Sequence, residues 1–105
     1  TVFLAIDGSR IVGCVFAAIR ETDIYLGKLA VAPERQGEGI GRRLLAQVEE
    51  LARARGKQAL ELQTRVELVG NHAAFCRMGF RETGRTAHPG FSRPTSITLQ
   101  KDVLR

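Results

Sequence analysis

The chain opens with three runs of apolar residues whose composition is typical of β-strands. These runs cover residues 2–6, 10–20 and 23–32. Asp7, Gly8 and Ser9 separate the first two runs and favour a turn, so an antiparallel hairpin is predicted. Gly13 in the second run indicates a bulge or a close approach of another segment. Pro33 ends the third run, because proline has no N–H to donate to a sheet.

The clearest periodic pattern follows a glycine-rich loop at residues 35–41. Apolar or small residues recur there with the i, i+3, i+4, i+7 spacing of an amphipathic helix. They are Gly41, Leu44, Leu45, Val48, Leu51 and Ala52. Glu49 and Arg53 stand on another face in the favourable i, i+4 order. Gly56 suits the left-handed residue that ends a helix. The pattern therefore predicts one amphipathic helix between the loop and Gly56.

The second half of the chain predicts a strand, a short helix and two further strands. The predicted strands cover residues 58–65, 80–86 and 95–101. Asn71 is a good N-cap for the short helix and Gly79 ends it. A turn is expected at His88, Pro89 and Gly90. The order β-β-β-α-β-α-β-β predicts an α/β fold with a mixed central sheet, antiparallel at first and parallel where helices intervene.

The length of 105 residues points to one domain over residues 1–105. No apolar run approaches the roughly 20 residues of a membrane span, and no signal peptide is recognisable, so we expect no membrane partner and a cytoplasmic location. Cys14 and Cys76 lie far apart without metal-binding spacing. We therefore expect two unpaired thiols and no metal.

The formal net charge of +5 favours a polyanionic partner, which includes nucleic acids and phosphate-rich cofactors. Arginines are interspersed with acids, as at Glu49, Glu50 and Arg53, and the few aromatic residues are not interleaved with basic ones. Both features disfavour nucleic acid, so a phosphate-rich cofactor is the better expectation.

The loop QGEGIG at residues 36–41 carries the strongest chemical signal. A strand runs into it and a helix runs out, so free backbone N–H groups and the helix dipole combine into an anion site. Arg42 and Arg43 add positive charge. A dinucleotide fingerprint that starts at Gly39 would need glycine where Leu44 stands, and the Gly-Lys-Ser/Thr of a P-loop is missing.

The segment LAVAPERQGEGIGRRLL at residues 29–45 resembles the acyl-CoA-binding motif of the GNAT superfamily of N-acetyltransferases. NHAAFCRMGF at residues 71–80 resembles the later family helix that ends in Gly-Phe. The order and spacing of the strands also match, so the resemblance covers nearly the whole chain. Family members usually open with a strand and two helices that wall the acceptor site. Those elements are not seen here, so we expect a domain that is truncated at its N-terminus or is completed by another segment.

The resemblance implies a GNAT-like fold that binds acetyl-CoA as acyl donor. The strand before the loop would splay from its neighbour, and the pantetheine arm would fill the gap. The loop would bind the pyrophosphate. The cofactor-binding residues implied are Leu29, Ala30, Val31, Gln36, Gly37, Glu38, Gly39, Ile40, Gly41, Arg42, Asn71, Phe75 and Arg77.

The resemblance also implies direct attack of a primary amine on the thioester. The Leu29 N–H would polarise the carbonyl. Tyr25 stands where family members often carry a catalytic Glu, and Phe75 stands where many carry a Tyr acid. Structural roles compete with these: Tyr25 as a strand aromatic, Asn71 as an N-cap alone, and Arg77 as a solvated cation. A Cys76 acyl-enzyme is disfavoured, because spacing places no base beside it.

Two other functions stay open on the sequence. One is a non-catalytic acyl-CoA-binding module, which the lack of an obvious acid and base favours. The other is a basic nucleic-acid-binding domain. For the enzyme, the expected partner is a small-molecule or peptide amine, and a homodimer is left open.

Overall fold

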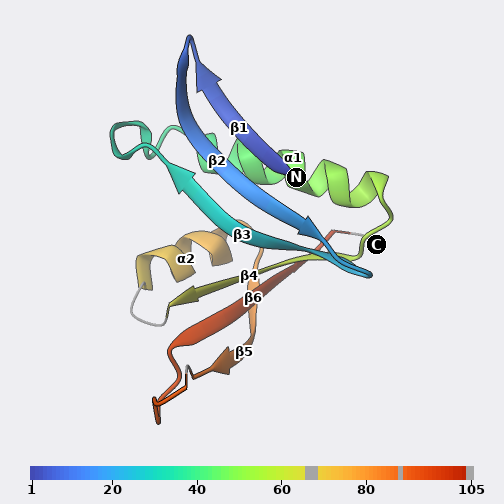
Figure 1. Ribbon diagram of the computed structural model, residues 1–105, viewed down its shortest axis with the longest axis vertical. Coiled ribbons are helices and arrows are strands. Elements are labelled where there is room, and N and C mark those ends of the chain that lie inside the picture. Colours follow the sequence, from blue (N-terminus) through green and yellow to red (C-terminus); the bar gives the residue numbers. More distant parts are fainter. Residues whose placement is uncertain (66–68, 88, 104–105) are drawn as a thin grey trace.

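The computed structural model arranges the elements in the predicted order (Figure 1). It describes residues 1–65, 69–87 and 89–103, with the side chains of residues 69–71 outside that description. The strands are β1 (Val2–Asp7), β2 (Arg10–Ile19), β3 (Asp23–Val31), β4 (Ala59–Arg65), β5 (Arg81–Thr86) and β6 (Ser96–Asp102). The helices are a short 3₁₀ turn η1 (Pro33–Arg35), α1 (Ile40–Ala54) and α2 (Val69–Arg77).

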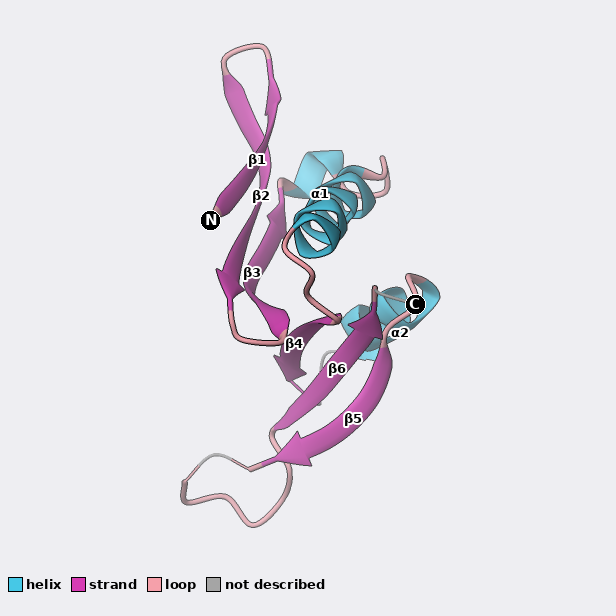
Figure 2. Ribbon diagram, turned by 90° about the vertical axis from the view of Figure 1, so that its right-hand side faces the viewer, coloured by secondary structure: helices cyan, strands magenta, loops and turns pink. Residues whose placement is uncertain are grey.

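The described strands form one mixed sheet in the order β1-β2-β3-β4-β6-β5. The β1–β2 and β2–β3 pairs are antiparallel, and β3–β4 is parallel, as the sequence predicts. The second helix, however, does not produce a second parallel pair, because β6 inserts between β4 and β5 and pairs antiparallel with both. Both helices lie on the same side of the strands (Figure 2).

Helix α1 covers the sheet with the apolar face that its periodicity predicts. Leu44, Leu45, Val48 and Ala52 are buried, and Ile40 extends this face to the first residue of the helix. They pack on a core that includes the strand residues Val12, Val15, Ala17, Ile24, Leu26, Leu60, Leu62, Ile97 and Leu99. Fully buried side chains come from β2, β3, β4 and β6, so α1 is anchored along both the antiparallel and the parallel parts of the sheet.

Gly13 lets α1 approach the sheet closely, which confirms its predicted role. A Cβ atom at Gly13 would lie 3.0 Å from Cγ2 of Ile40, 3.2 Å from Cδ1 of Leu44 and 3.2 Å from the Ala30 carbonyl oxygen. A β-bulge also lies beside Gly13, where the β1–β2 register shifts. Because Ile40 begins α1, the size of residue 13 sets the height of the helix N-terminus above the sheet.

The helix ends are partly as predicted. Gly56 (φ 69°) and Gly79 (φ 99°) are left-handed and follow α1 and α2. The N-cap prediction for Asn71 is wrong, because α2 begins two residues earlier, at Val69. The Asn71 side chain and the predicted turn residue His88 lie outside the described residues.

We expect Gly13→Ala to lower the free energy of unfolding by about 1–3 kcal/mol, because the added methyl group overpacks the contact with α1. Urea denaturation measures the change. Gly84→Ala is the matched control: the new methyl group would meet nothing within 4 Å, so its effect should stay within about 0.5 kcal/mol. Equal stabilities of the two variants would contradict this account of Gly13.

Candidate active site

The candidate site begins where β3 and β4 stop pairing. Their parallel ladder has four residue pairs, from Asp23–Ala59 to Leu26–Leu62. Beyond it, β3 runs on to Val31 without pairing with β4. The β2–β3 register shifts at this point, leaving Gly27 as an extra residue. A bulge of this kind bends a strand, which accounts for the separation of β3 from β4.

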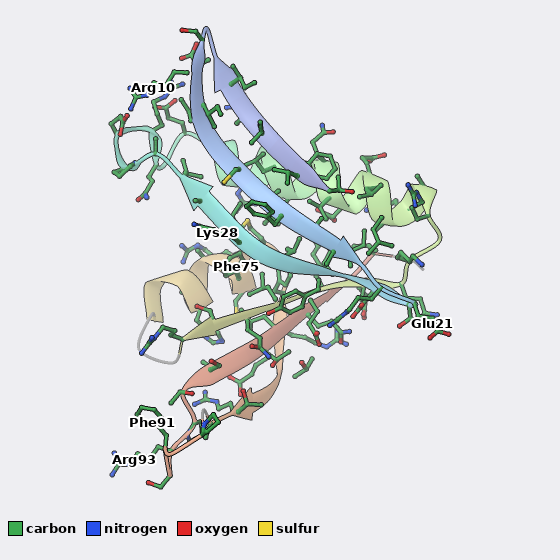
Figure 3. All side chains as sticks on the ribbon, viewed as in Figure 1. Arg10, Glu21, Lys28, Phe75, Phe91 and Arg93 are labelled. Carbon is green, nitrogen blue, oxygen red and sulfur yellow. The ribbon has the colours of Figure 1, made fainter. Side chains whose placement is uncertain are left out.

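The separated strands border a cleft of about 460 Å³. Tyr25 and Leu29 line it from β3, Gln63 and Thr64 from β4, and Phe75 from α2. Figure 3 labels Lys28 of β3 and Phe75 of α2, which both line this cleft. The cleft therefore lies between two strands, β3 and β4, and is bordered by α2.

The free edge of β3 presents backbone groups to this cleft. The Ala32 N–H donates to the Val12 carbonyl of β2 at 2.8 Å, and Val31 lies opposite Gly13. Because neighbouring residues in an antiparallel ladder alternate in direction, the N–H and C=O groups of Val31 and Leu29 point away from β2. The Gln36 Nε2 donates to the Val31 carbonyl at 3.4 Å. A ligand that runs from the cleft at Leu29 to the loop hollow at Val31 would therefore find the Val31 N–H and both backbone groups of Leu29 available for pairing, as the resemblance implies.

The glycine loop follows β3 and leads directly into α1. Gly37 (φ 87°) and Gly39 (φ 84°) adopt left-handed conformations that other residues reach only with strain. No side chain caps α1, and no acidic residue lies in its first turn. The first N–H groups of the helix have no intrahelical partner, so they and the helix dipole favour an anion here.

A hollow of about 350 Å³ lies against this loop. Its lining includes Gln36, Gly37, Gly39, Ile40, Gly41, Arg42 and Arg77. Among the described residues, neither Arg42 nor Arg77 takes part in an ion pair, so both guanidinium groups are available to a ligand. The Glu38 carboxylate is held by the Arg35 Nε at 2.9 Å and does not line the hollow. The hollow therefore has the charge that a phosphate group requires.

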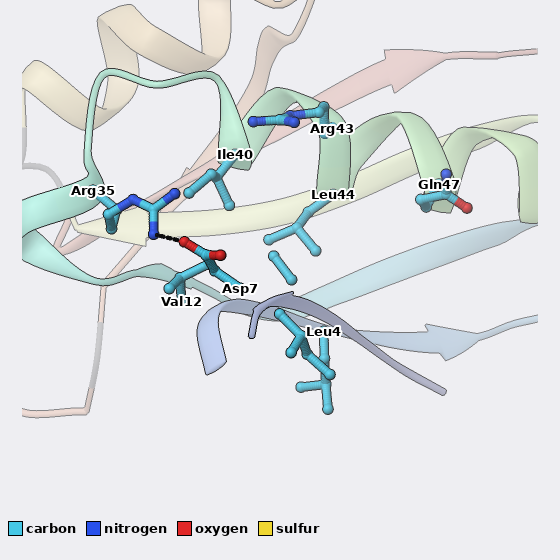
Figure 4. A pocket seen from close by; sticks show the side chains of 10 residues that line it. Leu4, Asp7, Val12, Arg35, Ile40, Arg43, Leu44 and Gln47 are labelled. Atoms are coloured by element: carbon cyan, nitrogen blue, oxygen red, sulfur yellow. Dashed lines mark hydrogen bonds and ion pairs between the residues drawn. The ribbon is translucent and has the colours of Figure 1, made fainter. Parts of the chain in front are cut away.

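Arg35 fixes the loop to the turn between β1 and β2. Its Nη1 donates to Asp7 at 2.7 Å while its Nε holds Glu38. These two hydrogen bonds, with Asp7 first, raise the pKa of Arg35. Arg10 and Glu34 form a second ion pair between the same segments. Figure 4 shows the Asp7–Arg35 pair at the edge of another hollow, of about 450 Å³, between β1 and α1.

The Tyr25 ring and the Phe75 ring are each held by a neighbour. The Arg20 guanidinium carbon lies 5.0 Å from the centroid of Tyr25. Phe75 packs edge-on against Phe80, with ring centroids 5.6 Å apart at 70°. Two candidate residues that are 50 positions apart in the sequence thus line one cleft with restrained side chains.

The structure divides most of the predicted site residues between these two places. Tyr25, Leu29 and Phe75 line the cleft, and Val31 lines the loop hollow with the residues named above. Ala30 lines neither, and Asn71 lies outside the description of side chains.

Sequence reasoning missed the cleft residues Lys28, Gln63, Thr64, Arg65 and Ser96. One signal was available: Lys28 is the sole charged residue between Tyr25 and Val31.

The cysteines lie outside the cleft lining. Cys14 is partly buried in β2, and Cys76 is exposed on α2. The sequence placed no base beside Cys76, but His72, one helical turn earlier, puts Nε2 3.8 Å from its Sγ. The same Nε2 lies 3.9 Å from Glu82. Within the described part of the chain, no group of three or more His, Cys, Asp or Glu residues could hold a metal ion.

Comparison with known proteins matches this geometry to a family. The sequence model of the acetyltransferase (GNAT) family matches residues 1–80. The chain belongs to the GNAT acetyltransferase family. Neither described helix is both long and apolar enough to cross a bilayer.

Two acetyltransferases are similar in sequence to part or most of this chain. The IAA acetyltransferase of Azospirillum brasilense is 36% identical over 95 residues, which are 89% of this chain and 61% of that protein. The aminoglycoside N(6')-acetyltransferase type 1 of Stenotrophomonas maltophilia is 45% identical over 58 residues, which are 55% of this chain and 38% of that protein. The chain thus spans less than two thirds of the length of either relative.

A solved structure agrees with the family fold. An aminoglycoside 6'-N-acetyltransferase complexed with coenzyme A matches 99% of this chain and 73% of its own, with a TM-score of 0.85 and 18% identity. At that identity the likeness supports the GNAT fold alone.

We expect Arg42→Ala and Arg77→Ala each to weaken the binding of inorganic pyrophosphate by about tenfold, because each removes one hydrogen-bonding cation from the loop hollow. Calorimetry at low ionic strength measures the affinity. Arg53→Ala is the control, since Arg53 pairs with Glu49 and Glu50 on α1 away from the hollow. A double variant at Arg42 and Arg77 with parental affinity would refute the anion site.

Proposed function

We propose that this chain is the acetyl-CoA-binding core of an N-acetyltransferase that transfers the acetyl group to a primary amine by direct attack. The observation that carries the proposal is the continuity of β3: one strand forms the free edge of the cleft and then leads into the anion-binding loop. In acetyl-CoA an extended arm joins the thioester to the pyrophosphate. Binding it would require a cleft for the arm and the thioester, followed by an anion site for the pyrophosphate.

Two parts of acetyl-CoA, the pyrophosphate and the pantetheine arm, have candidate sites among the described residues. The loop amides, with Arg42 and Arg77, would hold the pyrophosphate. The backbone groups of Leu29 and the N–H of Val31 would pair with the amides of the pantetheine arm. The absence of a side chain at Gly41 keeps the first turn of α1 accessible. The pyrophosphate and the pantetheine arm would therefore each meet groups of suitable chemistry.

The reaction needs few groups from the protein. The amine nitrogen bonds to the acetyl carbon, the carbon–sulfur bond breaks, the amine loses a proton and the thiolate gains one. We assign the Leu29 N–H to stabilising the negative charge that develops on the carbonyl oxygen. We assign the Tyr25 hydroxyl to donating the proton to the thiolate. Phe75 cannot donate a proton, and its ring would shield the thioester from water.

The acceptor belongs to the broad class of small-molecule or peptide amines. The relatives are named for different acceptors, so their names narrow the class no further. The unpaired cysteines are in keeping with a reducing compartment, and the proposal places the reaction in the cytoplasm.

The donor site can be tested by Gly41→Ala. Gly41 does not have a positive φ, and its new Cβ would lie 3.9 Å from Val31, so the fold should accept it. Replacing a helical glycine should raise stability by roughly 0.5–1 kcal/mol. We expect the affinity for CoA to fall by about tenfold, because the methyl group enters the loop hollow and displaces one charged hydrogen bond.

Calorimetry with CoA and thermal unfolding together decide this prediction. Gly84→Ala again serves as the control and should bind CoA like the parent. Parental CoA affinity in a folded Gly41→Ala variant would contradict the donor site. CoA binding without release of thiol from acetyl-CoA, across a panel of polyamine, aminoglycoside and peptide acceptors, would favour the non-catalytic module instead.

We expect a Cys14→Ser, Cys76→Ser double variant to keep the parental rate of acetyl transfer, because neither thiol lines the cleft. Steady-state kinetics with acetyl-CoA measure the rate, and intact mass after incubation with acetyl-CoA detects any acyl-enzyme. Loss of turnover with retained CoA binding, or an acetylated Cys76, would replace direct attack by a covalent relay that uses His72.

A further inference from the structure

Arg20 forms a network of ion pairs beside the β3–β4 ladder, at the end where the two strands are paired. Its Nε and Nη2 bind the two carboxylate oxygens of Asp23 at 2.6 and 2.5 Å. The same Nη2 binds Glu61 at 2.6 Å. Asp23 begins β3 and Glu61 belongs to β4, so one nitrogen connects the two strands that separate farther along. Arg20 thus spans the parallel ladder near its start.

This network is more constrained than an ordinary surface ion pair. The Arg20 side chain is 43% exposed, but those of Asp23 and Glu61 are only 14% and 24% exposed, so both carboxylates are half-buried. The backbone N–H of Arg20 also donates to the Asp23 carbonyl at 2.9 Å. The hydrogen bonds to Asp23 and then Glu61 raise the pKa of Arg20. Bidentate geometry in a network is the arrangement in which such pairs contribute measurably.

The network also reaches the proposed acid. Tyr25 is the register partner of Glu61 in the parallel ladder, so the two side chains lie on the same face of the sheet. The Arg20 guanidinium lies over the Tyr25 ring at 5.0 Å from its centroid, a cation–π contact. Tyr25 and Leu26 are the last two residues of β3 that pair with β4, and both line the cleft.

We propose that Arg20 is a positioning residue: it holds β3 to β4 where the cleft begins and fixes the Tyr25 ring at the cleft. The proposal rests on the proposed function for its kinetic part, since it assumes that Tyr25 acts on the reacting sulfur. Arg20 itself does not line the cleft. Its effect on the reaction therefore passes through Tyr25.

Removal of Arg20 has a definite physical consequence. Asp23 and Glu61, two half-buried carboxylates that lie diagonally across the ladder, would then lack the cation they share, and like charges in such surroundings repel. The ladder has only four residue pairs, so this repulsion would weaken a short strand pairing. The Tyr25 ring would also lose the cation that restrains one of its faces.

The first test uses the chain's own fluorescence, because Tyr25 is its only tyrosine and it has no tryptophan. Acrylamide quenching should increase in Arg20→Ala, because the ring is released to solvent. Arg20→Lys should lie between Arg20→Ala and the parent, since lysine keeps the charge but loses the bidentate fork. Arg53→Ala, which removes an arginine that pairs with carboxylates on α1 away from the cleft, should quench like the parent.

The second test is a double-mutant cycle on acetyl transfer. We expect Arg20→Ala to lower kcat by roughly 10- to 100-fold, the size of effect that misplacement of a reacting group produces. The affinity for CoA should change by less than about twofold, because the loop hollow is untouched. In a Tyr25→Phe background, Arg20→Ala should have little further effect, because the hydroxyl that it positions is already gone.

The outcomes separate this proposal from the proposed function. Parental quenching in a folded Arg20→Ala variant overturns the positioning role, and the quenching test needs no acceptor. Losses in kcat that multiply between Arg20→Ala and Tyr25→Phe also overturn it, since Arg20 would then act independently of Tyr25. Failure of the parent to bind CoA would instead refute the proposed function, while increased quenching in Arg20→Ala would still support the structural part of this proposal.

Discussion

The candidate site depends on the short length of the parallel ladder between β3 and β4. Four residue pairs join the strands, and the bulge at Gly27 turns β3 away before a fifth pair can form. The backbone of Leu29 and Val31 is thereby left without a strand partner in the interior of the sheet. Unpaired backbone groups of this kind are costly when buried, and a ligand with amide groups would satisfy them. The fold thus keeps open a position that resembles that of a missing strand.

Local patterns are enough to predict much of this arrangement. The strands, the amphipathic face of α1 and the glycine loop follow from spacing alone, because each depends on residues that are neighbours in the chain. Gly37 and Gly39 adopt left-handed conformations, and Gly13 lets α1 approach the sheet closely. Each of these roles depends on the lack of a side chain at one position, so the sequence indicates it directly. The loop half of the site can therefore be predicted from the amino-acid sequence alone.

The cleft half cannot be predicted in the same way. Thr64 and Ser96 line the cleft because β6 pairs with β4, and no local pattern indicates that β6 inserts there. Arg20 and Glu61 are 41 positions apart, so their contact depends on the register of the parallel ladder. Asn71 shows that a local pattern can also mislead: it suits an N-cap, but α2 begins two residues earlier, at Val69. Tertiary pairing decides each of the cleft positions.

The insertion of β6 has a consequence for how the molecule folds. β1, β2, β3 and α1 contact one another over short stretches of chain, so this part can assemble through short loops. The β4–β6 ladder instead joins Ala59 to Asp102 and extends over seven pairs. Closing that long loop is entropically expensive before its contacts form, and non-local strand pairing of this kind slows folding. The N-terminal half should therefore form early in refolding, and the wall of the cleft that β4 provides should be completed last.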